Sequence, residues 1–358
     1  MVSLSLSERF ALIQKLASVK QSVAQAMTDE FFLQHPDWLA RYGERGRQFC
    51  TADACFHIDF LAGAIEADSP PAFADYSRWT ARMLGSRGIG AHSLEENLAQ
   101  LEKHLSAALN PSERETVATF LAHGREACRE SDSPPKAQPS EGRLELTRDV
   151  FLAAILGGQR QAALGIVEEA LRFGHSIVDV YVDVFTESLY RVGDLWERNK
   201  ISVAQEHLAT SITQYAIAAV YRQMVPSRVN RGGMVVTGVA GESHQIGANI
   251  VADAMEAEGW TVRFLGTNLP HSSIVAAVRE ISASVLCIST TILANLPAVV
   301  ELMETVRSQL KEDPPRIVLG GAAYRMATQF ASEAGASEVV TDLRGALALL
   351  APDGIASS

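Results

Sequence analysis

Cysteine is scarce in this sequence. The 358 residues contain four, Cys50, Cys55, Cys128 and Cys287, and none of them forms a Cys-x-x-Cys pair. Structural zinc sites use such pairs, and disulfide scaffolds need a much denser set of cysteines. The spacing therefore indicates neither a structural zinc site nor a disulfide scaffold.

Basic residues are outnumbered by acidic ones. The chain has 31 Lys and Arg against 42 Asp and Glu, which gives a formal net charge of -11 and a pI of about 5.4. A broad nucleic-acid-binding surface requires an excess of positive charge. We therefore expect no direct nucleic-acid partner.

Long apolar runs are also missing. No stretch is apolar for the roughly 20 residues that a membrane helix needs, and the N-terminus lacks the basic-then-apolar pattern of a signal peptide. The expectation is a soluble cytoplasmic protein without a membrane partner. Hydrophobic residues still make up 47% of the chain, enough for real cores, and the length suggests about two or three domains.

The first part of the chain shows helical periodicity and no strand pattern. Apolar residues recur at helical spacing, and the predicted helices span residues 7–28, 52–66, 71–85, 93–109 and 112–129. Residues 1–129 are thus predicted to form an all-α domain, either a bundle or globin-like. Residues 130–143 are rich in Pro, Ser and charge, which predicts a linker.

A second helical block follows the linker. Helices are predicted at residues 148–156, 160–173, 177–198 and 202–225. Connections this short favour antiparallel neighbours, so residues 144–228 are predicted to form a four-helix bundle.

The last part alternates apolar runs with amphipathic stretches. Strands are predicted at residues 234–239, 261–265, 285–289, 317–319 and 338–341, and helices at 246–258, 272–282, 294–310, 322–334 and 343–350. This alternation predicts a five-stranded, doubly wound parallel sheet over residues 229–358, a Rossmann-like domain.

A histidine lies where such a sheet binds ligands. Glu242-Ser243-His244-Gln245-Ile246-Gly247 joins the first predicted strand to its helix, at the carboxyl edge of the sheet. His244 could bind a metal through one ring nitrogen while Glu242 orients the other. Gly247 would let a large flat ligand approach the backbone. The alternative is a loop histidine with ordinary hydrogen bonds.

Three further pieces accompany this loop. Trp196 ends one predicted helix and, after nine residues, the next helix carries Glu206-His207; Ser289-Thr290-Thr291 and Gly320-Gly321 follow the third and fourth strands. In this order, over about residues 145–350, the set resembles the light-sensing cobalamin-binding domain of the CarH-type photoreceptors.

The resemblance implies a role for each residue. His244 would be the lower axial ligand of cobalt, and its loop, with Glu242, Ser243, Gln245, Ile246 and Gly247, would contact the cofactor. Ser289, Thr291, Gly320 and Gly321 would line the groove for its nucleotide tail. Trp196 would cover the upper face, and Glu206 and His207 would contact the adenosyl group.

The same resemblance implies a function. The chain would bind adenosylcobalamin, light would break the cobalt–carbon bond, and the helical block would then move against the sheet. The outcome would be a conformational or oligomeric change passed to a separate protein partner. The chain itself would not be an enzyme, since no nucleophile–base pair or phosphate loop is present.

Two features depart from the family. No helix-turn-helix module is recognisable in the N-terminal part, where family members that bind DNA carry one, so direct operator binding is not expected. The residue after Trp196 is Glu197, where CarH has a histidine that captures cobalt after photolysis. A bis-histidine light state formed by that route is therefore not expected.

The N-terminal block holds an aromatic cluster. His57, Tyr76 and Trp79 lie near Cys50 and Cys55 at spacings that place them on helical faces. The joined architecture is similar to that of the photocobilins, cobalamin photoreceptors that also bind a bilin. The cluster would then hold biliverdin, bound covalently through Cys50 or Cys55 or noncovalently. The alternative is an ordinary core with a hydrogen-bonded histidine.

Two other functions fit the same sequence. One is a corrinoid carrier protein of a methyltransferase system, which needs an open upper face for its partner enzymes. The other is a haem-binding or redox-sensing antirepressor, with His57 as proximal ligand.

Overall fold

The computed structural model describes residues 4–130, 144–224, 227–327 and 329–351. The predicted linker therefore lies, except for Glu130, outside the described residues. Contacts group the chain into two units. Unit 1 is the described part of Met1–Pro134 with Thr291–Glu301 and Ala323–Gly335. Unit 2 is the remainder, so two segments that follow strands belong to the N-terminal helices.

The N-terminal part is helical, as predicted. Its helices are α1 (Leu6–Gln34), α2 (Pro36–Glu66), α3 (Pro70–Gly85), α4 (Ala91–Ser106) and α5 (Pro111–Arg129). Periodicity missed the first half of α2, because that half is polar and its helix is kinked at Gly43, which has φ 61°. Only glycine adopts such a conformation without strain.

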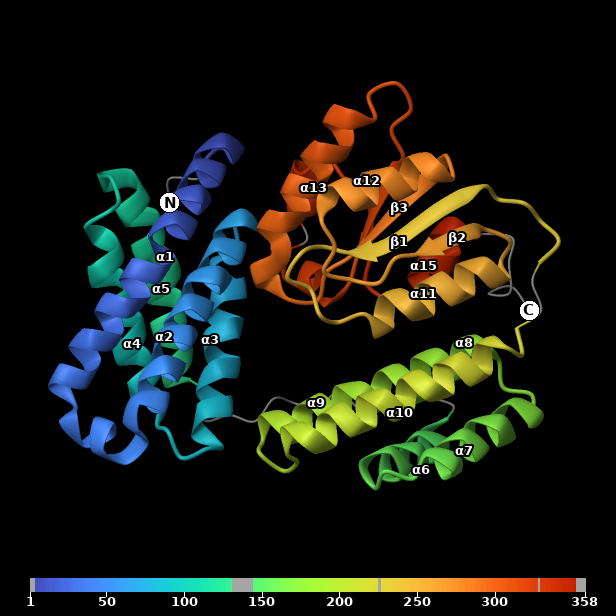
Figure 1. The fold of residues 1–358 in the computed structure, drawn as a ribbon, viewed down its shortest axis with the longest axis horizontal. Helices are drawn as coiled ribbons and strands as arrows, with labels where there is room; N and C mark the ends of the chain where they lie inside the picture. The colour runs from blue at the N-terminus through green and yellow to red at the C-terminus, as the bar shows by residue number, and fades with distance from the viewer. Residues whose placement is uncertain (1–3, 131–143, 225–226, 328, 352–358) are drawn as a thin grey trace. The chain divides into compact units, whose positions relative to one another are not determined.

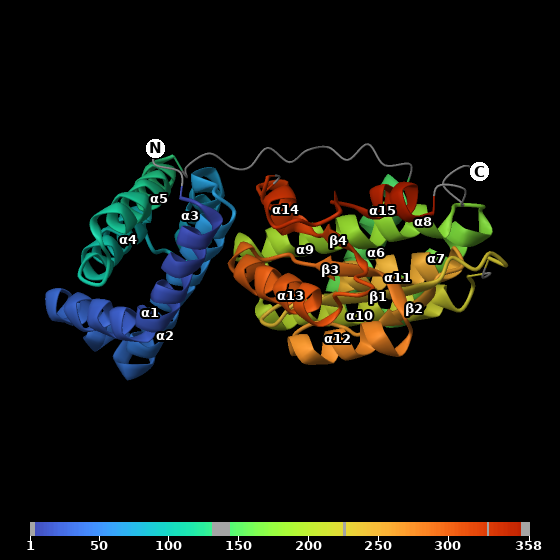
Figure 2. The same cartoon turned by 90° about the horizontal axis from the view of Figure 1, so that it is seen from above.

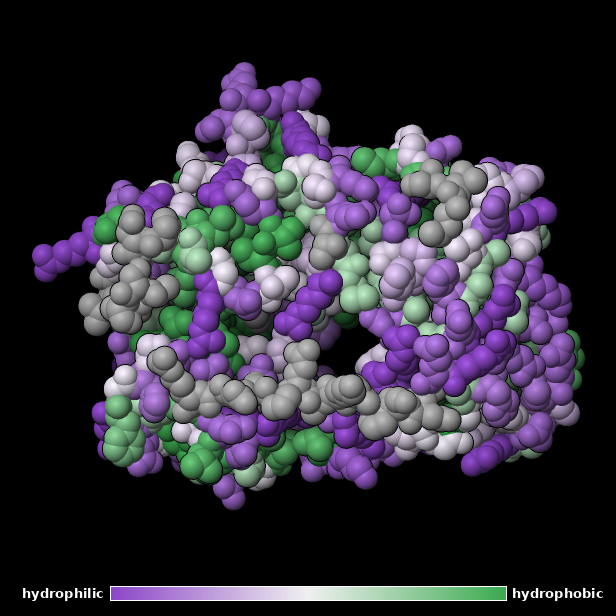
Figure 3. Space-filling model, turned by 180° about the vertical axis from the view of Figure 1, so that it is seen from behind, coloured by the Kyte–Doolittle hydropathy of each residue, from purple (hydrophilic) through white to green (hydrophobic). Residues whose placement is uncertain are grey.

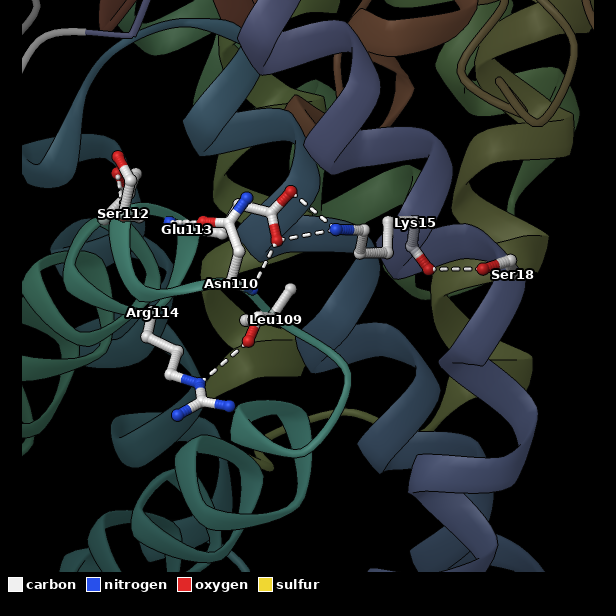
Figure 4. Close-up of polar contacts among 8 residues, drawn as sticks. Lys15, Ser18, Leu109, Asn110, Ser112, Glu113 and Arg114 are labelled. Atoms are coloured by element: carbon white, nitrogen blue, oxygen red, sulfur yellow. Dashed lines mark hydrogen bonds and ion pairs between the residues drawn. The ribbon is translucent and has the colours of Figure 1, made fainter.

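A polar contact joins α1 to the start of α5 (Figure 4). Lys15 Nζ lies 2.6 Å from Glu113 Oε1, and Glu113 Oε2 accepts a hydrogen bond of 2.8 Å from the backbone of Asn110. Asn110 in turn accepts from the backbone N–H of Glu113, which completes a capping box. Glu113 therefore both caps the start of α5 and pairs with Lys15 of α1.

The second helical block contains α6 (Glu145–Leu156), α7 (Arg160–Arg172), α8 (Ile177–Asp179), the π-helical η1 (Val180–Thr186), α9 (Glu187–Glu197) and α10 (Val203–Tyr221). The predicted helix over residues 177–198 thus contains a π-helical turn, a feature that periodicity cannot distinguish. Fully buried Tyr181, Phe185 and Phe151 pack together within this block.

A five-stranded parallel sheet completes unit 2, which confirms the predicted sheet. Its strands are β1 (Gly233–Gly238), β2 (Thr261–Phe264), β3 (Ala283–Ser289), β4 (Arg316–Gly320) and β5 (Glu338–Val340), in the order β2-β1-β3-β4-β5. Helices cover both faces: α11 (Ile246–Ala257) and α15 (Leu343–Leu350) one face, α12 (His271–Glu280) and α13 (Leu296–Gln309) the other (Figures 1 and 2).

The helix predicted at residues 322–334 is wrong. The structure has a 3-10 turn, η3 (Ala322–Arg325), and a short helix, α14 (Phe330–Glu333). Buried Tyr324 and Phe330 stack with ring centroids 6.1 Å apart, so tertiary packing replaces a continuous helix. Similarly, η2 (Leu293–Asn295) precedes α13, whose second residue is Pro297, a position that suits proline.

One core joins the helical block to the sheet within unit 2. Alternate residues of β1 and β3, Met234, Val236, Val285 and Cys287, share a buried cluster with α6–α11 and α15. Polar contacts at its rim connect the same layers: Tyr181 Oη donates to Asp253 Oδ2 over 3.2 Å. Figure 1 shows α10 lying along α11.

The surface is mixed in polarity. Figure 3 shows hydrophilic side chains interrupted by smaller apolar patches. Within the described part of the chain, no helix has both the length and the apolar character to cross a membrane.

Candidate functional site

The carboxyl ends of three neighbouring strands meet in one row. Gly238 of β1 pairs with Ser289 of β3, and Ser289 pairs with Gly320 of β4. Between β1 and β3 the following helices, α11 and α13, go to opposite faces of the sheet. Ligands bind at such a switch point, so the loops after β1, β3 and β4 form the candidate site.

A buried carboxylate orients His244. Glu242 is 0% exposed, and its Oε1 accepts hydrogen bonds from His244 Nδ1 at 2.7 Å and from the His244 backbone N–H at 2.9 Å. The His244 side chain is 55% exposed. The bond at Nδ1 fixes the tautomer and leaves Nε2 as the nitrogen available to a metal.

Electrostatics favour the protonated imidazole in the absence of a metal. The hydrogen bond to Glu242 raises the pKa of His244, although burial opposes it, and the charges of Glu242 and Glu206 raise it further. Because a bound metal needs the neutral ring, binding would release a proton here.

The loop after β2 holds the His244 loop in place. The backbone N–H of Gly241 donates to Asn268 Oδ1 over 2.9 Å, and Asn268 N–H donates to the carbonyl of Val239 over 3.2 Å. A Cβ on Gly238 would come within 2.6 Å of Thr267 Cγ2. The close approach of the two loops therefore requires glycine at this strand end.

Next to His244, the predicted contact residues are open to solvent. Ser243, Gln245 and Gly247 are exposed, Ile246 is half-buried, and nothing lies within 4 Å of where a Cβ on Gly247 would be. A large ligand has room on this side of the loop.

The turn between α9 and α10 carries the predicted upper-face residues. Trp196 is half-buried near the end of α9, and Ser202 caps α10, so that Glu206 and His207 lie in its first turns. Glu206 Oε2 is 3.4 Å from His207 Nδ1, and its Oε1 accepts from Thr210 at 3.0 Å. The charge of Glu206 is one of the causes that raise the pKa of His244.

The loops after β3 and β4 are locked together at the edge. The backbone N–H of Thr290 donates to the carbonyl of Gly320 over 2.8 Å, and Thr290 is fully buried. Gly321 has φ +113°, and a Cβ there would lie 2.3 Å from the Thr290 carbonyl oxygen. Ser289, Gly320 and Gly321 are thus brought together in unit 2, whereas Thr291 begins a segment of unit 1.

In unit 1 the structure brings His57, Tyr76 and Trp79 together. His57 Nδ1 lies 2.6 Å from Tyr76 Oη, and Phe60 stacks on Tyr76 with ring centroids 3.8 Å apart. The ring centroids of Tyr76 and Trp79 are 6.5 Å apart. Burial lowers the pKa of His57 to about 4, so the ring is neutral at pH 7.

Sequence reasoning missed three residues beside this cluster. Phe49, Asp53 and Phe56 are exposed and share a face of α2 with Phe60, at spacings of four and three residues. Although Asp53 is exposed at the surface, desolvation by the protein around it raises its pKa to about 6. The predicted helix at residues 52–66 contains Asp53 and Phe56, but Phe49 lies before its predicted start, so the shared face was not recognised.

Comparison with known families gives two matches. Two family models, both described as a B12 binding domain, match residues 147–221 and residues 232–351. Together these ranges cover more than half of the chain, and their boundary falls between the helical block and the sheet.

Curated relatives match the same region. The chain is 24% identical over 171 residues to dimethylamine corrinoid protein 1 of Methanosarcina mazei, which covers 47% of this chain and 79% of the relative. It is 26% identical over 167 residues to dimethylamine corrinoid protein 3 of the same organism (44% and 98%). It is 24% identical over 172 residues to trimethylamine corrinoid protein 1 of Methanosarcina acetivorans (47% and 80%).

A solved structure shares the fold. The monomethylamine corrinoid protein of Methanosarcina barkeri aligns with a TM-score of 0.53 at 18% identity, covering 59% of this chain and 100% of that one. The residues present fit a corrinoid. His244 can offer Nε2 to a metal because Nδ1 is bonded to Glu242, and the space beside Gly247 is open. By these matches the chain belongs to the family of B12-binding proteins, and its ligand is a cobalamin or a closely related corrinoid.

Proposed function

We propose that this chain is a non-enzymatic light sensor that holds adenosylcobalamin. The observation that carries the proposal is the turn between α9 and α10, which places Glu206 close enough for its charge to act on His244. Trp196 at the end of α9 and His207 near the start of α10 lie on either side of this turn. A bulky aromatic and two polar groups near this turn would suit a large upper ligand rather than an open face.

The residues of the His244 loop hold the lower side. His244 Nε2 would bind cobalt, while buried Glu242 keeps Nδ1 as the hydrogen-bond donor. When bound in its adenosyl form, the cofactor supplies a cobalt–carbon bond that visible light breaks. Trp196 would pack on the adenosyl group, and Glu206 and His207 would contact it or its surroundings.

The proposed signal is a change in packing within the helical block. Its far end is fixed to α11 by Tyr181–Asp253 and Tyr221–Glu256 contacts of 3.2 and 2.8 Å. Loss of the upper ligand would remove the packing partner of Trp196 at the other end. A local loss of contacts then biases a two-state arrangement, which a separate partner or a second copy would read.

A corrinoid methyl carrier is the second candidate. The comparisons favour it over the light sensor, because the relatives named above are methylamine corrinoid proteins. Such a function would use the same His244 ligation, a methyl group above the cobalt, and partner enzymes that approach the upper face. No specific observation favours the haem-binding or redox-sensing alternative.

We also propose a second chromophore, biliverdin, at the cluster of unit 1. His57 and Tyr76 would offer a buried polar pair, and Asp53 a carboxyl group at the open side. Burial raises the pKa of the Cys50 and Cys55 thiols. Because a thiolate is the attacking species, we expect noncovalent binding.

A spectroscopic experiment separates the candidates. The full chain is mixed in the dark with adenosylcobalamin, methylcobalamin or biliverdin, desalted, and scanned before and after green light. A light sensor retains adenosylcobalamin, and its corrin bands shift on illumination. A methyl carrier retains methylcobalamin, releases the adenosyl form, and transfers the methyl group to an acceptor thiol only with a partner enzyme. If biliverdin is lost during desalting, the proposal of a second chromophore is wrong.

Two variants test the axial role. In His244→Ala the retained corrinoid should lose the spectrum of histidine ligation, and its affinity should fall about tenfold or more. His123→Ala is the matched control, because His123 is an exposed histidine on α5 of unit 1. An unchanged spectrum in His244→Ala would remove His244 from the axial position.

A further inference from the structure

A tight turn joins β1 to the His244 loop. The backbone N–H of Glu242 donates to the carbonyl of Val239 over 3.1 Å, which closes a turn over residues 239–242. Gly241, the third residue of this turn, has φ 82°. A positive φ at this position is typical of a type II turn, which favours glycine there. The turn therefore fixes the point at which Glu242 leaves the strand end.

One residue of the loop after β2 holds this turn. The backbone N–H of Asn268 donates to the Val239 carbonyl over 3.2 Å, and Asn268 Oδ1 accepts from the Gly241 N–H over 2.9 Å. The N–H of the third residue takes no part in the turn's own hydrogen bond. Asn268 therefore gives this N–H a partner, and it contacts both the first and the third residue of the turn.

The backbone of the loop after β2 sets the position of the Asn268 side chain. Asn268 has φ 60°, a left-handed conformation that asparagine adopts more readily than most residues. Before it, the carbonyl of Gly266 accepts from the Gly238 N–H over 3.0 Å. After it, Pro270 restricts the preceding residue to extended backbone. Because the loop is restrained on both sides of Asn268, the amide of this residue is held against the turn.

The turn is important because it ends at a buried carboxylate. Glu242 is fully buried, and its Cγ would lie 3.3 Å from a Cβ added to Gly238. Glu242 Oε1 accepts hydrogen bonds from the ring and the backbone N–H of His244. Water solvates an ionised carboxylate better than a protein interior does. If the turn opened, Glu242 would move toward water and the His244 ring would lose its orientation.

From this arrangement we infer that Asn268 is a positioning residue for the metal ligand, because it holds the turn through which Glu242 orients His244 for binding cobalt. The inference rests on the axial role of His244 in the proposed function. It applies to the light sensor and to the methyl carrier alike, since both would use the same His244 ligation. Asn268 acts through Gly241 and Glu242 and is not itself a ligand.

The test removes the Asn268 side chain with and without the axial histidine. Asn268→Gly deletes the amide and still allows the left-handed backbone. The full apo chain is titrated with hydroxocobalamin, and the dissociation constant should rise about fivefold, as expected for one lost hydrogen bond. In the His244→Ala background the same substitution should change the dissociation constant by less than about twofold, because its effect passes through His244.

Two further variants serve as controls. Asn268→Asp keeps an oxygen that accepts from the Gly241 N–H, so it should restore binding to near the wild-type value. Ser282→Gly changes another exposed residue with positive φ, 48°, in the turn that precedes β3. This turn lies at the amino end of its strand, whereas the His244 loop lies at the carboxyl edge of the sheet, so binding should not change.

A spectroscopic measurement tests the axial role of His244 separately. The wild type is labelled with ¹⁵N, its bound cofactor is reduced to cob(II)alamin, and the electron paramagnetic resonance spectrum is compared with that of unlabelled protein. Splitting by a protein nitrogen changes from triplets to doublets on labelling, whereas the cofactor's own base gives triplets in both samples. If His244→Ala retains no measurable corrinoid, Glu242→Ala replaces it in the binding comparison, because the effect of Asn268 also passes through Glu242.

The outcomes separate the inference from the proposed site. Triplets in the labelled wild type would overturn the axial role of His244 and the inference with it. Doublets, together with an Asn268→Gly variant that binds like the wild type or loses as much affinity without His244 as with it, would overturn the inference alone. A loss of affinity that appears only when His244 is present, and that Asn268→Asp restores, supports it.

Discussion

At the scale of single residues, the site depends on one buried carboxylate. Glu242 is fully buried, and its Oε1 orients His244 by accepting hydrogen bonds from the ring and from the backbone N–H. Since the raised pKa of His244 reflects binding of the protonated ring, the pair stabilises the folded loop at pH values below about 6.5, the unperturbed value. That contribution is lost as the pH rises through the raised pKa.

Glu242→Gln should therefore lower the pKa of His244 toward its ordinary value. The neutral amide still accepts a hydrogen bond but no longer attracts the imidazolium. An NMR titration of the His244 ring in the apo protein measures the pKa directly. In the same variant, the rise of cobalamin affinity with pH should move to lower pH, because the ring loses its proton earlier. An unmoved His244 pKa would contradict the assigned role of Glu242.

At the scale of elements, the helical block is joined to the sheet layer by a titrating contact. Tyr181 of η1 and Asn249 of α11 both donate to Asp253 Oδ2, at 3.2 and 2.9 Å. Burial nevertheless raises the pKa of Asp253 to about 6. The folded state thus holds this proton to higher pH than the unfolded chain, whose Asp pKa is about 3.9, and the stability falls as the pH rises between these values.

The substitution Asp253→Asn should abolish this fall in stability with rising pH. Asparagine keeps an acceptor for Tyr181 and carries no charge to desolvate. Relative to the wild type, the free energy of unfolding of the variant should increase from pH 4 to pH 6, by about 1 kcal/mol for this half-buried group. Urea unfolding at several pH values, followed by circular dichroism, measures the difference. Parallel pH profiles for the two proteins would show that Asp253 is not a destabilising charge.

At the scale of the whole molecule, the two units do not follow the order of the chain. The sequence predicts an N-terminal domain, a linker, a bundle and a sheet, one after another. The contacts assign Thr291–Glu301 and Ala323–Gly335, from within the sheet region, to the N-terminal helices. Leu296, Tyr324 and Phe330 of these segments are almost completely buried.

A fragment of residues 144–358 should therefore be less stable than the full chain. It keeps the sheet and the helical block but loses the packing of α2 on η2 and the ion pair between Arg9 and Glu333. Its melting temperature should be lower, and hydrogen exchange in residues 291–301 and 323–335 should be faster, while β1 and β3 stay protected. Equal exchange in both segments would mean that the N-terminal helices contribute nothing to their packing.

Much of the fold was predictable because its periodicities are strong. The buried strands and the helices between them are long enough to show a period, and most predicted bounds lie within a few residues of those observed. The predictions failed where local pattern is weak or packing overrides it. The polar first half of α2 has little apolar periodicity, and residues 322–334 are shaped by the contacts of Tyr324 and Phe330.

The candidate site divides in the same way. Its loops were predictable, because a ligand site in a parallel sheet lies at the carboxyl ends of strands, and strands are visible in the sequence. The partners of the site residues were not. Neither the burial of Glu242, nor the effect of the Glu206 charge on the pKa of His244, nor the desolvation of Asp53 has a signal in the local sequence.

The sequence by itself determined the helical and sheet regions of this protein, the parallel alternation, and the loop that carries His244. These follow from hydrophobic period and turn residues, which act over short stretches of chain. Only the tertiary structure decided that Gly63 and Arg9 hold segments more than 200 residues away. Such contacts depend on shape and charge between distant parts of the chain, which no local pattern encodes.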